Sequence, residues 1–178
     1  GIDVEEAGMA NAPPLRLLMS ENRHESILRA VRLLGIGTTA VEILPCDDSG
    51  GIRLDDLAAA LSGSADRPTI VCLQAGDLNT GVFDAFEPAC SLAHAVGAWV
   101  HVDGAFGLWA ATSERHHHYL DGVAQADSWA TDGHKWLNVP FDNAFVFVAD
   151  ADAHRAVFAQ VTSYAEPVHG VREQKDWN

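Results

Sequence analysis

Short β-favouring runs alternate with stretches of helical periodicity along most of the chain. The runs predict strands at residues 39–44, 69–73, 98–102, 127–130 and 144–148. Apolar residues at helical spacing predict helices over residues 20–34, 54–61, 88–96 and 151–161, and Ser20 is the expected cap of the first. This alternation indicates an α/β fold with three layers, α/β/α, around a mostly parallel sheet.

The two ends of the chain lack such patterns. Residues 1–19, which contain Pro13 and Pro14, are predicted to be an irregular lead-in, and the polar residues 162–178 a mobile loop or tail. We therefore expect one ordered domain over residues 20–161. With 178 residues, of which 48% are apolar and 20% charged, the chain is typical of a globular domain.

Charge and cysteine content narrow the possible partners and location. A net charge of −14 with neutral histidines disfavours binding to nucleic acid or to an anionic membrane surface. The sequence shows no signal peptide and no apolar run long enough to span a bilayer. Cys46, Cys72 and Cys90 lie far apart, as expected of reduced thiols. These features predict a cytoplasmic protein.

The chemistry is expected at one edge of the sheet. Ligands of parallel α/β sheets bind outside the carboxyl ends of the strands, where the loops at residues 74–80, 103–107 and 131–135 lie. The third loop contains Lys135, beside His134 and between apolar strands. Such a setting favours a neutral amine that acts as a nucleophile. The commonest reaction of such an amine is a Schiff base with a carbonyl, often that of pyridoxal phosphate.

Asp103, at the end of a predicted buried strand, supports two interpretations. Its carboxylate either pairs at the strand end or keeps the nitrogen of a pyridinium ring protonated. A rival hypothesis is a metal-dependent hydrolase, because His101 with Asp103, and Asp132 with His134, resemble pairs of metal ligands. The hydrolase hypothesis gives no role to Lys135.

Two motifs connect these observations. Residues 101–105 read His-Val-Asp-Gly-Ala, and residues 128–136 end in His-Lys-Trp, so that Lys135 follows Asp103 by 32 residues. With these motifs and this spacing, the chain resembles group II pyridoxal-phosphate-dependent amino-acid decarboxylases over nearly all of residues 20–178. That family includes glutamate, histidine and aromatic-amino-acid decarboxylases. The resemblance implies a partial large domain of the fold-type I pyridoxal-phosphate enzymes, which have the fold of aspartate aminotransferase.

The resemblance also implies roles for individual residues. Lys135 would form the Schiff base with pyridoxal 5′-phosphate, Asp103 would pair with the pyridine nitrogen, and Ala105 would pack on the ring. By pattern alone His24 is an exposed first-turn histidine, but it matches the family histidine that stacks on the other face of the ring. His134 would lie beside the phosphate and the lysine.

Other positions match the family less closely or depart from it. Asn79 and Thr80 resemble the loop that edges the cofactor, and Tyr164 matches a mobile-loop tyrosine that protonates the intermediate. By pattern alone, Tyr164 is a surface anchor or an acid on a mobile loop. Asp132 stands where relatives often have an asparagine that contacts phosphate, and Gly104 replaces the more usual alanine.

The resemblance implies decarboxylation of an L-amino acid to its amine and carbon dioxide, by a homodimer with sites at the subunit interface. It also implies that the phosphate-binding cup and the small C-terminal domain lie outside this chain, so we expect a fragment with little activity alone. The substrate side chain is chosen largely by residues outside it. Other pyridoxal-phosphate reactions (carbon–carbon lyase, aminotransferase), a non-catalytic module of the same fold and the metal-dependent hydrolase stay open.

Overall fold

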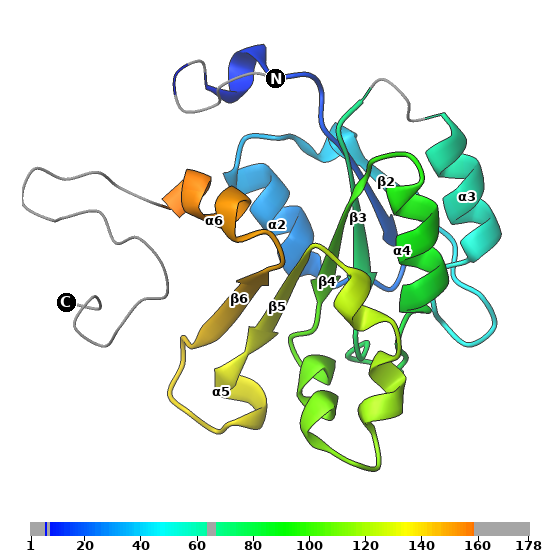
Figure 1. Cartoon of the computed structure of the whole chain (residues 1–178), viewed down its shortest axis with the longest axis vertical. Coiled ribbons are helices and arrows are strands. Elements are labelled where there is room, and N and C mark those ends of the chain that lie inside the picture. Colours follow the sequence, from blue (N-terminus) through cyan, green and yellow to red (C-terminus); the bar gives the residue numbers. More distant parts are fainter. Residues whose placement is uncertain (1–5, 7, 64–66, 159–178) are drawn as a thin grey trace, which may run out of the picture.

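One six-stranded sheet organises the protein, whose computed structural model describes residue 6, residues 8–63 and residues 67–158 (Figure 1). The strands lie in the order β2-β1-β3-β4-β5-β6. Their bounds are β1 Arg16–Ser20, β2 Val41–Leu44, β3 Thr69–Gln74, β4 Trp99–Asp103, β5 Ser128–Asp132 and β6 Ala144–Val148. All neighbours pair in parallel except β6, which is antiparallel to β5. The mostly parallel sheet predicted from the sequence is confirmed.

Helices cover both faces of the sheet. Helix α2 (Glu25–Leu33) lies on one face, and α3 (Leu54–Ser62) and α4 (Phe86–His94) lie on the other (Figure 1). Helix α5 (Gly133–Trp136) is a single turn after β5, and α6 (Ala151–Phe158) follows β6. Short 3₁₀ helices fill connections: η1 Met9–Asn11, η2 Thr38–Ala40, η3 Gly107–Thr112, η4 His117–Leu120 and η5 Val123–Gln125. No helix of the described residues combines the length and apolar character needed to cross a membrane.

Two apolar clusters hold the three layers together. The larger one, on the α3–α4 side, includes the buried β4 residues Val100 and Val102. The smaller one, on the α2 side, includes Met19 and Cys72. Because successive strand residues point to opposite faces, and Cys72 is the register partner of His101, the side chains of His101 and Asp103 face α2. The polar residues of β4 are therefore kept out of the larger core.

Strand β1 corrects the prediction that residues 1–19 are irregular. Residues Arg16–Ser20 form a strand between β2 and β3, and all but the first of them are buried. Ser20 was expected to cap the first helix, but it ends this strand. The N-cap of α2 is His24, whose Nδ1 accepts a hydrogen bond from the backbone N–H of Ser26 at 3.2 Å.

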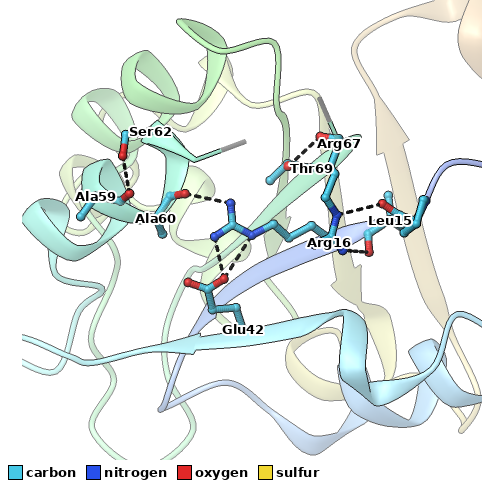
Figure 2. A network of polar contacts seen from close by, with 9 residues as sticks. Leu15, Arg16, Glu42, Ala59, Ala60, Ser62, Arg67 and Thr69 are labelled. Atoms are coloured by element: carbon cyan, nitrogen blue, oxygen red, sulfur yellow. Dashed lines mark hydrogen bonds and ion pairs between the residues drawn. The ribbon is translucent and has the colours of Figure 1, made fainter. Parts of the chain in front are cut away.

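Arg16, at the start of β1, joins β2 to α3 (Figure 2). Its Nε and Nη2 donate to Oε2 of Glu42 at 3.1 and 2.6 Å, and its Nη1 donates to the carbonyl oxygen of Ala60 at 2.8 Å. The Ala60 carbonyl belongs to the last turn of α3. The guanidinium therefore fastens an edge strand and a helix end to the centre of the sheet.

Candidate active site

A cavity of about 670 Å³ is bounded by α2 and by the carboxyl ends of β3, β4 and β5. Its lining includes five residues predicted for the site: His24, Asp103, Ala105, His134 and Lys135. The other lining residues are Ser26, Ile27, Ala30, Gln74, Gly76, Leu78, His101, Phe106, Ala130, Asp132 and Phe141. The cavity lies where a parallel sheet is expected to bind its ligand.

Lys135 lies in the single turn of α5, directly after β5. Its Nζ is 2.9 Å from Oδ2 of Asp132 and 4.2 Å from the ring centroid of Phe106. The side chains of Lys135 and Asp132 are 24% and 22% exposed. The sequence predicted an apolar setting for this lysine, whereas the structure places it between a carboxylate and an aromatic ring.

Asp103 ends β4 and faces the same cavity. Its Oδ1 accepts a hydrogen bond from the backbone N–H of Ala105 at 3.2 Å, which holds the carboxylate at the start of the following loop. The backbone of Gly104 approaches Leu108 so closely that a Cβ at Gly104 would lie 2.7 Å from that of Leu108. This close approach accounts for glycine at a position where alanine is more usual.

His24 contributes from the α2 side of the cavity. Its Nδ1 lies 2.8 Å from the hydroxyl of Ser26, in addition to the bond from the backbone N–H of that residue. These two contacts fix the ring at the helix N-terminus. His24 is therefore both exposed at the start of the helix and part of the cavity wall.

His134 is held by the loop that precedes β6. Its Nδ1 accepts from the backbone N–H of Asn143 at 3.0 Å, and its ring centroid lies 4.1 Å from that of Phe141. The backbone N–H groups of Gly133 and His134 both donate to the carbonyl oxygen of Asn143, at 2.9 and 3.2 Å. This clasp fixes the turn that carries Lys135.

Asn79 and Thr80 lie outside the lining of the cavity, although Leu78 is part of it. Their backbone N–H groups donate to Oδ2 of Asp77 at 2.9 and 2.6 Å, and the Thr80 hydroxyl donates to the same atom at 2.8 Å. Burial raises the pKa of Asp77, but these bonds outweigh it and the pKa is lowered overall. Both residues shape the loop, and their contact with a cofactor stays a prediction.

Two further hypotheses from the sequence concern a metal site and the role of Tyr164. Within the described ranges, no three His, Cys, Asp or Glu side chains are grouped so that they could hold a metal ion. The rival ligand set of His101, Asp103, Asp132 and His134 therefore has no support from geometry. Tyr164 lies outside the described residues, so its role stays a prediction.

Several residues that line or support the site were not predicted from the sequence. Phe106 contacts Lys135, and Phe141 contacts His134. The backbone of Asn143 is hydrogen-bonded to α5. The Nε1 of Trp109 donates to the backbone carbonyl of Asp132 at 3.1 Å and supports the end of β5. Asn143 comes nine residues after His134 along the chain, and only the antiparallel return of β6 brings the two together.

Residues 4–176 match the family model described as "Pyridoxal-dependent decarboxylase conserved domain". The chain belongs to this family. The family resemblance predicted from the aspartate and lysine motifs is thereby confirmed. The family description itself specifies dependence on pyridoxal, in agreement with the predicted cofactor.

Named relatives of this decarboxylase-family chain support the same assignment. Cysteine sulfinic acid decarboxylase of Homo sapiens is 34% identical over 139 residues, which are 76% of this chain and 28% of that protein. The crystal structure of mouse CSAD in apo form has a TM-score of 0.83 at 27% identity, over 93% of this chain and 36% of that one. The crystal structure of Oryza sativa TDC with PLP has a TM-score of 0.73 at 27% identity, over 86% of this chain and 34% of that one.

The decarboxylase-family chain thus spans 28% of the length of the human relative that it matches. The structural matches confirm the fold class predicted from the sequence, that of the fold-type I pyridoxal-phosphate enzymes.

The residues of the cavity fit a pyridoxal cofactor. An amine, Lys135, and a carboxylate, Asp103, suit an aldehyde and a pyridine nitrogen, and the small side chains of Ala105 and Ala130 leave room for a flat ring. The Asp132 carboxylate would repel a phosphate ester, and its oxygen is paired with Lys135.

Proposed function

We propose that this chain is the cofactor-binding part of an enzyme that decarboxylates an L-amino acid to its amine and carbon dioxide with pyridoxal 5′-phosphate. One observation carries the proposal. Lys135 and Asp103 come from the carboxyl ends of neighbouring parallel strands and face one cavity, with His24 from α2 in the same wall. An amine and a carboxylate in this arrangement can hold the two reactive ends of a single ring.

The proposed roles follow from that arrangement. The bound cofactor supplies an electron sink for the pair of electrons left behind when carbon dioxide departs. Nζ of Lys135 would hold the cofactor covalently. Asp103 would keep the ring nitrogen protonated by charge–charge attraction.

The residues that line the cavity would orient the cofactor and the substrate. His24 and Ala105 would bound the ring on its two faces, so that the substrate carboxylate can stand perpendicular to the ring. His134, beside Lys135 in α5, would face the phosphate. Tyr164, as in the family it resembles, would be the donor of the proton that replaces carbon dioxide, and Asn79 and Thr80 would edge the cofactor.

The substrate class is proposed from the relatives. The human relative at 34% identity is named for cysteine sulfinic acid, an amino acid with an anionic side chain. We propose an L-amino acid as substrate and cysteine sulfinate as the first compound to assay. Product analysis by mass spectrometry separates the amine of a decarboxylase from the products of an aminotransferase or of a carbon–carbon lyase.

The test of the proposal is chemical trapping. The full-length protein is incubated with pyridoxal phosphate, reduced with borohydride and mapped by peptide mass spectrometry. We expect the reduced adduct on Lys135 and the formation of amine from the substrate. This chain contains two lysines, Lys135 and Lys175, so Lys175→Arg is the matched control and should keep the adduct and the activity.

Lys135→Ala is expected to lose the adduct and at least about a thousandfold of kcat. Full activity in that variant would overturn the proposal. An adduct on Lys175 alone would overturn the assignment of Lys135.

The predicted boundaries, homodimer and cytoplasmic location stay proposals that follow from the family resemblance. The domain would comprise residues 20–161, extended at its start by β1, and residues 162–178 would form a loop or tail. Sedimentation of the full-length protein tests the dimer, and fractionation of the cells that make it tests the location.

A further inference from the structure

A hydrogen-bonded chain of three side chains lies beside Asp103 on the α2 face of the sheet. Ser128 is the register partner of His101 across β4 and β5. The Ser128 hydroxyl lies 2.9 Å from Nε1 of Trp99 and 2.9 Å from Nδ1 of His101. Ser128 is only 8% exposed, so these bonds are shielded from bulk water. The reaction proposed above does not use any of these three residues.

The donors and acceptors of these two hydrogen bonds fit a neutral His101 with an unprotonated Nδ1. An indole N–H can only donate, so Trp99 occupies one lone pair of the Ser128 oxygen. The hydroxyl proton of Ser128 then needs an acceptor, and among the described residues His101 Nδ1 is the one in range. A protonated Nδ1 would direct two N–H groups at one oxygen and leave a buried hydroxyl proton without a partner.

Burial of His101 acts in the same direction. Removal from water lowers the pKa of His101, against the opposing influence of Asp103. Cys72, its register partner on β3, adds no charge, because burial and Asp103 raise the pKa of that thiol to about 12. The other titratable groups that line the cavity with His101 are His24, Asp103, Asp132, His134 and Lys135.

The position of His101 makes its charge state matter. Alternate residues of a strand lie about 7 Å apart on the same face, so the imidazole is a neighbour of the Asp103 carboxylate. A positive imidazole there would compete with the ring nitrogen of the cofactor for that carboxylate.

We propose that His101 is a positioning residue whose neutral imidazole, held by Ser128 and Trp99, leaves the negative charge of Asp103 available to the cofactor nitrogen. This inference rests on the proposed role of Asp103.

The first test needs no cofactor. NMR of isotope-labelled histidine in the cofactor-free, full-length protein reports which ring nitrogen carries the proton, and His101→Asn identifies the signal. We expect a mostly neutral ring with a bare Nδ1 at about pH 6.5, where an ordinary histidine is half protonated. An imidazolium at that pH, or a proton on Nδ1, would overturn the inference. Because no cofactor is present, this result does not depend on whether Lys135 forms an adduct.

The second test is the affinity for pyridoxal phosphate as a function of pH. Ser128→Ala removes the hydroxyl that donates to Nδ1 and so allows His101 to become charged. We expect the ratio of variant to wild-type dissociation constants to be close to one at about pH 8. At about pH 6 we expect the ratio to rise roughly five- to tenfold, the effect of a charge near a partly buried carboxylate.

Three variants separate positioning from a merely structural role. Ser128→Thr keeps the hydroxyl and should restore the wild-type profile. The double variant Ser128→Ala with His101→Asn has no ionisable ring at position 101, so its pH-dependent rise should vanish. Thr69→Val removes another buried strand hydroxyl, far from the cavity, and should leave the ratio near one at both pH values. A rise that persists in the double variant, or a ratio independent of pH in Ser128→Ala, would overturn the inference.

Discussion

Nζ of Lys135 lies 2.9 Å from Oδ2 of Asp132, the last residue of β5. The same oxygen lies 3.6 Å from Nε2 of His134. One carboxylate therefore contacts both basic side chains of α5. It orients the lysine, and it also places a negative charge in the cavity proposed to receive a phosphate ester.

Replacement of Asp132 tests how much its negative charge weakens the binding of the cofactor. We expect Asp132→Asn to bind pyridoxal phosphate about three- to tenfold more tightly at low salt, because one repulsive charge is removed. The gain should shrink at high salt, since screening weakens the repulsion in the native protein. Fluorescence titration at two ionic strengths measures it. Asp152→Asn, which breaks the exposed ion pair with Arg155, is the control and should show no gain.

The charge of Asp103 can be removed with little change of shape. Asparagine keeps an oxygen that accepts from the backbone N–H of Ala105, so the loop after β4 should hold. We expect Asp103→Asn to lower kcat roughly a hundred- to a thousandfold while the protein still binds cofactor. Steady-state kinetics with absorbance of the bound cofactor measure both. Unchanged kcat would contradict the proposed role, and Asp121→Asn on the surface is the control.

Asp84 is a buried carboxylate with a structural role. Its two oxygens accept from the backbone N–H groups of Ile52 and Gln74, each at 2.7 Å. In Asp84→Asn an amide N–H group would face one of these donors. We expect a loss of about 1–3 kcal/mol in the free energy of unfolding near neutral pH, measured by urea denaturation.

The pH dependence of this loss has a definite sign. Burial raises the pKa of Asp84 more than its two hydrogen bonds lower it, and Asp47 raises it further. The folded state therefore binds the proton more tightly than the unfolded state. The stability from this group falls as pH rises from the ordinary carboxyl value to the raised one. The loss of stability caused by Asp84→Asn should therefore become smaller as pH rises between these two values. A loss that grows with pH would contradict a raised pKa of Asp84.

Gly104 is expected to tolerate no side chain. An added Cβ would lie 2.7 Å from the Cβ of Leu108 and 3.2 Å from the carbonyl oxygen of Ala130. We expect Gly104→Ala to cost about 1–3 kcal/mol of stability and to weaken cofactor binding, because the loop with Ala105 must shift. Thermal unfolding and cofactor titration measure the two effects. Gly63→Ala, whose Cβ would lie 3.9 Å from the carbonyl oxygen of Ala60, should be tolerated.

The sequence predicted the strands that contain β-favouring runs. β3 was found because Thr69–Leu73 form one continuous run, and β4 because Trp99, Val100 and Val102 surround His101 with β-favouring residues. β1 was missed because it begins with Arg16, ends with Ser20 and closely follows Pro13 and Pro14. Its strand character comes from its place between β2 and β3, which is not a local property of the chain.

The site was predictable where its residues belong to recognisable sequence motifs. Lys135 and Asp103 were found by residue type, order and spacing, and the parallel sheet brings them to one edge. The ion pair with Asp132 and the contact with Phe106 depend on side-chain directions within one turn. The link between Trp99, Ser128 and His101 depends on strand register, which a single strand does not specify.

The clasp on Asn143 gives the connection between α5 and β6 a fixed length. Asn143 accepts from the N–H groups of Gly133 and His134 and returns a bond to the His134 ring. A residue inserted at 137–142 would have to bulge outward, or else break all three bonds and let the turn with Lys135 drift. The length of this loop therefore sets the position of the Lys135 amine. Any transfer of the lysine motif into another scaffold must carry residues 133–143 as one block.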